Sequence, residues 1–327
     1  EQEVATANAN SKTIATWWDT SIAAGTFPKK AYLAYHVNEN LFIKQVTVDS
    51  NGAIDAVTTV SPALPADCLT TTANEHPLDI TMTGNSQYIF IAYRIIEESA
   101  ITTGAPVVRV YKLDKNDIPG TNYTARCMKF DVVTGGIGQI VANAGAWYLP
   151  FIKVTDSNQV SMIEAKATDD VLDTVNNQTK LTSNVEATRV RSVYDGDGGR
   201  NRVIVAKQLL NGNISLYAYD VPMPPYGGMP ASEAPTNPSG DIALYDTLDP
   251  MKDFEITKGG VGNPYLFIVG KNQSVGSSNE YLLARRKIAD LSDDFGLVDA
   301  RKISTRLMAP ALTPSRRLRP LPLPLGL

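Results

Sequence analysis

The residues best suited to chemistry lie in one acidic, glycine-rich stretch, YDGDGGRN at residues 194–201. Asp195, Asp197 and Asn201 offer side-chain oxygen atoms, which Ca²⁺ takes as ligands, and the glycines between them permit the tight curvature of a calcium loop. The same residue types also form plain turns, in which an Asp or Asn side chain accepts hydrogen bonds from the backbone. The two flanking arginines offset the acidic charge and favour the plain turn. The stretch is therefore either a calcium site or a simple hairpin turn.

A second candidate binding group is aromatic. Trp17, Trp18, Trp147 and Tyr148 form the densest aromatic group of the chain, and such rings stack on sugars and on flat organic ligands. Trp17 and Trp18 are adjacent, so on a strand they point to opposite faces, one toward the core and one toward solvent. These residues predict either a ligand contact or packing alone.

A third candidate is the segment VPMPPYGGMPASEAPTNPSG at residues 221–240. Its Pro, Gly and small polar residues predict a long loop between strands. Met223, Tyr226 and Met229 suit an irregular apolar ligand, because methionine adapts its shape. The alternative is a loop that only packs onto the body.

No catalytic constellation can be assembled from the sequence. His36 lies in an apolar run and His76 in a polar one, and there is no Gly-x-Ser-x-Gly elbow, phosphate loop or His-Glu-x-x-His. A hydrolase would need carboxylates from separate segments to converge. The acidic residues that adjacent strands could bring together are Asp19, Asp79, Asp131 and Asp253. We expect a protein that is not an enzyme, with a hydrolase built from such separate carboxylates as an alternative.

The elements that position these residues repeat along the chain. Five segments each lead from a polar or glycine turn into a short apolar run, a loop and a second alternating run. With Tyr32, Tyr88, Tyr148, Val203 and Tyr265 taken as equivalent, the spacings are 56, 60, 55 and 62 residues. Another short strand-like run precedes most of these segments, so each unit of roughly 58 residues is a sheet of three or four antiparallel strands.

Sheets of this kind become stable when arranged radially, as in a β-propeller. We predict an all-β chain with a single propeller over residues 1–314, most simply of five blades, followed by a Pro-rich basic tail at residues 315–327. Six blades are the alternative, if the runs at residues 13–19 and 298–304 together complete a blade or close the ring. Little helix is expected, and the best helical candidates are residues 171–180 and 280–291, of which the second is equally a strand with a charged rim.

Two resemblances to known families follow from these motifs. Asp197-Gly-Gly-Arg-Asn201, with Asp195 before it, resembles the calcium turn of integrin-type propeller repeats, which implies Ca²⁺ at these three residues. The runs VRVYKLDKND from Val108 and NISLYAYD from Asn213 make the repeats resemble the fungal fucose-lectin type of propeller. That family binds sugar between blades with an Arg, a Glu and an aromatic residue, which implies a sugar contact for Arg109.

The composition argues against two classes of partner, nucleic acid and the membrane interior. With 30 Lys and Arg against 34 Asp and Glu, the net charge of −4 provides no field that would recruit nucleic acid. No apolar run approaches the roughly 20 residues that span a bilayer. Cys68 and Cys127 allow one disulfide, and a secretory setting is expected from four glycosylation sequons, which begin at Asn122, Asn177, Asn213 and Asn272.

The sequence therefore predicts a soluble, non-catalytic β-propeller that binds a glycan or a small organic molecule. Two further functions stay open at this point, a carrier of an apolar or pigmented compound and a protein-interaction propeller. Calcium is the one cofactor that the motifs suggest.

Overall fold

The computed structural model describes residues 14–37, 40–60, 75–97, 107–118, 125–130, 134–154, 157–169, 178–180, 187–196, 202–210, 213–220, 253–259, 265–273, 279–291 and 300–303. Several of the predicted features lie outside this description, namely Asp197, Asn201, Met223, Tyr226, Met229, the Pro-rich tail, and the side chains of His36, His76, Cys68 and Cys127.

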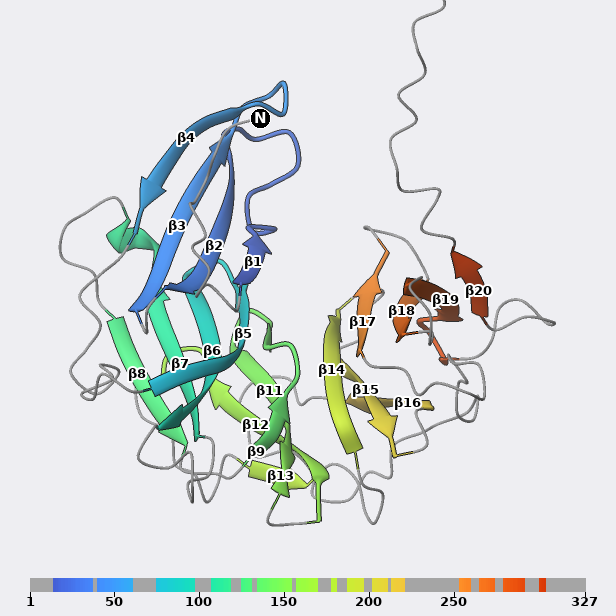
Figure 1. Ribbon diagram of the computed structural model, residues 1–327. Helices are drawn as coiled ribbons and strands as arrows, with labels where there is room; N and C mark the ends of the chain where they lie inside the picture. Colours follow the sequence, from blue (N-terminus) through green and yellow to red (C-terminus); the bar gives the residue numbers. More distant parts are fainter. Residues whose placement is uncertain are drawn as a thin grey trace, which may run out of the picture.

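The described residues form five separate sheets, which we call sheets A to E (Figure 1). Sheet A contains β1 (Ile14–Trp18), β2 (Lys29–Val37), β3 (Asn40–Val48) and β4 (Ile54–Thr59). Sheet B contains β5 (Glu75–Gly84), β6 (Tyr88–Glu97), β7 (Val107–Asp114) and β8 (Ala125–Phe130). Sheet C contains β9 (Thr134–Ile137), β10 (Val141–Ala142), β11 (Ala146–Lys153), β12 (Gln159–Lys166) and β13 (Gln178–Lys180).

Sheet D contains β14 (Ala187–Asp195), β15 (Arg202–Leu209) and β16 (Ile214–Asp220). Sheet E contains β17 (Asp253–Lys258), β18 (Tyr265–Gln273), β19 (Asn279–Lys287) and β20 (Ala300–Ile303). Strands pair antiparallel with their neighbours in sequence, and in sheet C both β9 and β10 pair with the same strand, β11. The sequence repeat is thus a repeat of sheets. The five residues taken as equivalent lie in β2, β6, β11, β15 and β18, each of which pairs with the first strand of its sheet, a position that β9 and β10 share in sheet C.

The described part of the chain is almost entirely β, as predicted, with one 3₁₀ turn at Lys115–Asp117. Of the two alternatives for residues 280–291, the structure shows the strand, because β19 occupies this stretch as far as Lys287. Residues 178–180 are likewise a strand, β13. Among the described residues no helix has the length and apolar character needed to cross a membrane.

The two terminal runs do not complete one sheet together. β1 pairs with β2 in sheet A, whereas β20 pairs with β19 in sheet E. The prediction that the two runs might share a blade is therefore wrong, since each finds its partner within its own repeat.

Neighbouring sheets pack face to face in sequence order through four apolar cores. Representative residues of the A–B core are Tyr32, Ile43, Met82, Ile91 and Tyr111. Those of the B–C core are Phe90, Val110, Trp147, Leu149 and Ile163. Those of the C–D core are Tyr148, Val160, Met162, Val203 and Val205. Those of the D–E core are Val193, Ile204, Phe254, Ile256 and Ile268.

This stacking explains the character of the strands. β11 and β12 are buried at all but their last residue, because sheet C is covered on both faces, and the sequence of β11, AWYLPFIK, is accordingly almost entirely apolar. The first strands lie on a common inner side, where β1 contacts β5, β5 contacts β10, β10 contacts β14 and β14 contacts β17. Figure 1 shows the sheets following an arc around these strands, with an opening between β1 and β17.

Candidate functional site

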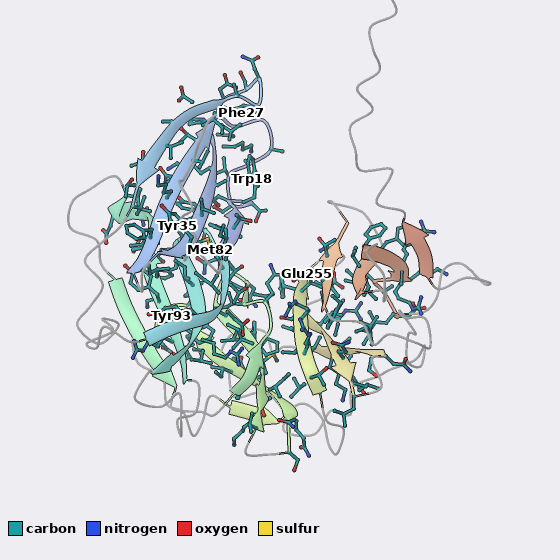
Figure 2. The ribbon with its side chains drawn as sticks, in the orientation of Figure 1. Trp18, Phe27, Tyr35, Met82, Tyr93 and Glu255 are labelled. Carbon is teal, nitrogen blue, oxygen red and sulfur yellow. The ribbon has the colours of Figure 1, made fainter. Side chains whose placement is uncertain are left out.

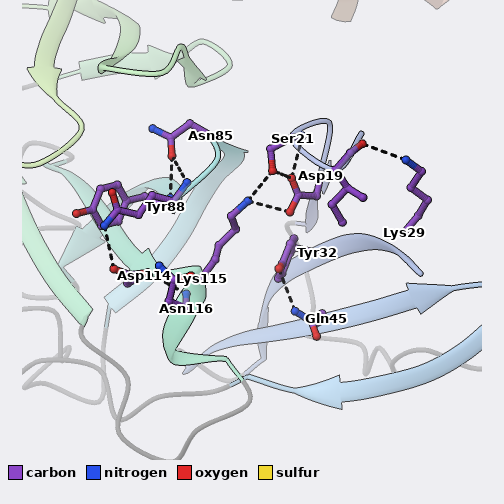
Figure 3. A network of polar contacts seen from close by, with 12 residues as sticks. Asp19, Ser21, Lys29, Tyr32, Gln45, Asn85, Tyr88, Asp114, Lys115 and Asn116 are labelled. Atoms are coloured by element: carbon purple, nitrogen blue, oxygen red, sulfur yellow. Dashed lines mark hydrogen bonds and ion pairs between the residues drawn. The ribbon is translucent and has the colours of Figure 1, made fainter. Parts of the chain in front are cut away.

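A cluster of polar side chains joins sheets A and B at the end of the first strand (Figure 3). Asp19 directly follows β1 and continues the pairing of that strand with β2, because its backbone N–H donates to the Lys30 carbonyl oxygen (2.9 Å). Lys115 opens the 3₁₀ turn after β7, and its Nζ donates to Asp19 Oδ2 (2.9 Å) and to Ser21 Oγ (3.0 Å). The Ser21 hydroxyl in turn donates to Asp19 Oδ1 (2.6 Å). Asp19 is buried and Ser21 is exposed, so the cluster extends from the interior to the surface.

Aromatic rings pack against the inner side of this cluster. Lys115 Nζ lies 5.3 Å from the centre of the Trp17 ring, and Trp17 stacks on Tyr32 with ring centres 5.7 Å apart. The Tyr32 hydroxyl accepts a hydrogen bond from Gln45 Nε2 (2.9 Å). Burial, more than any other cause, raises the pKa of Tyr32 to about 12, so this hydroxyl stays protonated near neutral pH and cannot act as a base.

The surface side of the same hairpin carries exposed aromatic residues. The Trp18 side chain is 47% exposed and Phe27, in the loop that joins β1 to β2, is 46% exposed. Lys29 anchors this loop, because its Nζ donates to the carbonyl oxygens of Ile22 (3.0 Å) and Ala23. Trp17 and Trp18 thus face opposite ways, as their alternation on a strand predicts.

Three other predicted site residues lie inside the sheet stack. Trp147 is fully buried in the B–C core, and Tyr148 is fully buried between sheets C and D. Arg109 pairs in register with Tyr93 and is buried on the face of sheet B that packs on sheet A. The structure therefore distributes these residues over three sheet interfaces and does not bring them together with Trp18.

The acidic turn of sheet D is partly described. Asp195 ends β14 and is fully buried, with its Oδ2 accepting from Arg202 Nε (3.1 Å) and its Oδ1 lying 3.6 Å from Lys258 Nζ of sheet E. Arg202 also donates to the Ile288 carbonyl oxygen, which adds a second link to sheet E. Both carboxylate oxygens thus face cations, an arrangement that suits a structural junction. In the described ranges no group of three or more His, Cys, Asp or Glu side chains could hold a metal ion, and calcium stays a prediction.

In sheets B and C, an Asn lies at the position that Asp195 has in sheet D, at the end of the first strand. Asn85 follows β5, and its Oδ1 accepts from the backbone N–H groups of Gln87 (2.9 Å) and Tyr88 (2.8 Å). Asn143 follows β10 and binds two backbone N–H groups in the same way. Asn85 Nδ2 also donates to the Asn143 carbonyl oxygen (3.2 Å), which joins sheet B to sheet C. An Asp or Asn at the end of the first strand is thus a recurring device that shapes a turn and links neighbouring sheets.

This device was missed by sequence reasoning, although its signal was present. WWD, TGN, VAN and VYD all place the acid or amide directly before a polar or glycine-rich turn. Of the carboxylates that a hydrolase could use, Asp19 pairs with Lys115 and Asp79 pairs with Arg94 Nε (2.7 Å). Each is bound to a different cation, while Asp131 and the Asp253 side chain lie outside the described residues.

Comparisons with known proteins identify the fold. The ectodomain of the parainfluenza virus 5 hemagglutinin-neuraminidase matches with a TM-score of 0.51 at 9% identity, over 90% of this chain and 72% of that one. It is a propeller protein. This chain has a β-propeller fold.

Two further solved structures match this chain with lower TM-scores. A mutant of AofleA from Arthrobotrys oligospora gives a TM-score of 0.44 at 12% identity, over 86% of this chain and 72% of that one. The Trypanosoma rangeli sialidase gives 0.46 at 9% identity, over 85% and 48%. No family model and no curated protein matches the sequence.

Proposed function

We propose that this propeller has five blades, one for each sheet and sequence repeat, and that it binds a glycan without catalysing a reaction. The proposed binding surface is the hairpin formed by β1, β2 and the loop between them. Its contact residues are Trp18, Phe27 and Ser21.

The observation that carries this proposal is the placement of exposed aromatic rings. Among the residues that the structure describes, Trp18 and Phe27 are the only aromatic side chains classed as exposed, and both belong to this one hairpin. Sugar rings present apolar C–H faces that pack on aromatic rings, and their hydroxyl groups need hydrogen-bond partners. The exposed Ser21 hydroxyl donates to Asp19 and accepts from Lys115, so it keeps one lone pair with which to accept a hydrogen bond from a sugar hydroxyl.

The loop is also held in shape before any ligand arrives. Lys29 binds two loop carbonyl groups, and Asp19 Oδ1 accepts from the Ser21 backbone N–H (3.1 Å). A preformed loop loses little conformational entropy on binding, which favours affinity. Such rigidity suits a recognition surface better than a lid that must move.

The carrier, calcium-binding and hydrolase functions receive less support from the described residues. The carrier proposal rests on Met223, Tyr226 and Met229, and the calcium proposal on Asp197 and Asn201 as well as Asp195. These residues, apart from Asp195, lie outside the described part of the chain. The hydrolase is not favoured, because Asp19 and Asp79 are each held by a cation. An interaction propeller is the second candidate, since the aliphatic Ile14 on β1 is 57% exposed.

A secretory setting with sequon glycosylation belongs to the same proposal. One sequon, Asn213-Ile-Ser215, has its serine buried in β16. Attachment at Asn213 would therefore have to precede folding of sheet D, and treatment of source-purified protein with a glycan-releasing enzyme would reveal any attached glycan as a loss of mass.

A glycan array followed by calorimetric titration of the best sugar tests the proposed function. Because each aromatic contact contributes about 1 kcal/mol or more, we expect Trp18→Ala and Phe27→Ala each to weaken binding about fivefold or more. Leu210→Ala is the matched control, since Leu210 is also an exposed large apolar residue but lies in the β15–β16 turn of sheet D. If the protein binds no sugar on the array, or if Trp18→Ala binds with unchanged affinity, the proposal is wrong.

A further inference from the structure

The β1–β2 hairpin carries positive charge that its own carboxylate does not balance. The charged side chains that the structure describes in β1, the loop and β2 are Asp19, Lys29 and Lys30. Asp19 is already bound to Lys115 of sheet B, with 2.9 Å between its Oδ2 and the lysine Nζ. The loop between the strands, TSIAAGTFP at residues 20–28, contains no charged residue. The hairpin therefore has two lysines for which it offers no acidic partner.

Lys29 is held in place by neutral groups only. Its Nζ donates to the carbonyl oxygens of Ile22 (3.0 Å) and Ala23, and Figure 3 shows the side chain directed at this loop. An ammonium group has three N–H donors, so one of them remains for a ligand. Carbonyl oxygen atoms carry no net charge, and so they fix the position of the lysine charge without neutralising it.

The same ammonium group lies beside an exposed aromatic ring. Lys29 Nζ is 5.8 Å from the centre of the Phe27 ring, and Figure 2 shows Phe27 near the outer end of the hairpin. A sugar that packs its C–H groups on Phe27 would bring the substituents at the edge of its ring close to Lys29. The faces of an aromatic ring are electronegative, so an anionic substituent would lie toward the lysine and not over the ring.

We propose that the ligand of this hairpin is an acidic sugar, which packs its ring on Phe27 and binds Lys29 Nζ through one carboxylate or sulfate ester group. This inference rests on the proposed glycan-binding function and names the chemical class of the glycan. One remaining N–H suits one singly charged group. A polyanion such as nucleic acid needs several cations along its length, and the net charge of −4 adds no wider attraction for it.

Matched sugars that differ only in charge test this inference. Glucose and galactose are each compared with the corresponding uronic acid and with the corresponding sulfate ester, first on an array and then by calorimetric titration. We expect the acidic sugar to bind about two- to fivefold more tightly than its neutral parent, which is the range for an ion pair at a protein surface. In about 1 M sodium chloride, where the screening length falls to about 3 Å, this preference should disappear while the neutral sugar still binds. A preference limited to the uronic acids or to the sulfate esters identifies the anionic group.

Lys30→Gln is the matched control for Lys29→Gln. Lys30 is also half-buried, but it lies on the face of β2 that carries Tyr32, opposite to Lys29. Lys29→Gln should abolish the preference for the acidic sugar, whereas Lys30→Gln should keep it. Because Lys29 also fixes the loop, the measured quantity is the ratio of the affinities for the acidic and the neutral sugar, which cancels a loss common to both. Lys29→Arg keeps the positive charge and should keep this ratio.

Three outcomes would contradict the inference. Equal affinity for the acidic and neutral sugars, with binding still weakened in Phe27→Ala, would overturn the acidic class and leave the glycan-binding function standing. An equal loss of the preference in Lys29→Gln and Lys30→Gln would show a general effect of surface charge, and so overturn a contact with Lys29. Binding of no sugar at all would overturn the proposed function and this inference together.

Discussion

At the scale of single residues, Asp19 shows how one side chain can be structural where the sequence suggested chemistry. The sequence placed it among possible hydrolase carboxylates, whereas the structure buries it between two sheets with Lys115 and Ser21 as partners. Lys115 is 96 positions away in the sequence, so no local pattern links the two residues. That one of the adjacent Trp17 and Trp18 is exposed, in contrast, followed from strand alternation, because that property depends on neighbours along the chain.

Removing the cation of this pair should destabilise the protein. Lys115→Met leaves the buried Asp19 carboxylate without its counter-charge, and breaking a buried pair in this way costs about 3 kcal/mol. The free energy of unfolding, measured with urea at neutral pH, reports the loss. The double variant Asp19→Asn with Lys115→Met is the control, and it should recover part of the stability because no unpaired charge remains. Equal losses in the single and double variants would contradict an ionic role.

At the scale of elements, the packing of β1 on β5 depends on the absence of a side chain at Gly84. A Cβ atom built there would lie 2.5 Å from Trp17 Cη2 and 2.8 Å from the Tyr88 carbonyl oxygen. Gly84→Ala should therefore push β1 away from β5 and cost about 1–3 kcal/mol, as overpacking usually does. Thermal unfolding monitored by circular dichroism measures the effect.

Gly136→Ala is the matched control for this substitution. Gly136 lies in β9, and a Cβ atom there would meet only Ile152 Cδ1, at 4.0 Å. Its melting temperature should stay close to that of the unmodified chain. A larger fall of the melting temperature in Gly136→Ala than in Gly84→Ala would show that strand flexibility, and not contact with Trp17, determines the loss of stability.

Elements were also the scale at which sequence reasoning worked best. The period of apolar runs identified the repeated sheets, because each strand pairs with a neighbour close in sequence. Residues 280–291 stayed open between helix and strand, because the run YLLARRK places four apolar residues before three basic ones and so has no clear period of either kind. The interrupted first strand of sheet C gave no sequence signal that we recognised.

At the scale of the whole molecule, contacts between sheets could not be predicted. Asn85 reaches the carbonyl oxygen of a residue 58 positions away, and Arg202 reaches one 86 positions away. These distances reflect how successive sheets are placed in space, which the period alone does not specify. The candidate binding hairpin became visible only once the structure showed which aromatic rings the stack of sheets buries.

In the five-bladed propeller that we propose, sheets A and E would pack on each other and close the ring, and this seam makes a prediction for the whole molecule. A linear stack would have weak ends, because sheets A and E would each be packed on one face and would open at lower free energy than sheet C. With the seam formed, amide hydrogen exchange in β2 and β18 should be protected to within about tenfold of that in β11. Phe267→Ala, in sheet E, should then speed exchange in β2 of sheet A as well as in β18, and leave β11 unchanged as the internal control. Only direct contact between A and E transmits a local loss of packing in this pattern, since a general loss of stability would also speed exchange in sheet C. Faster exchange confined to sheet E would instead indicate a stack with two independent ends.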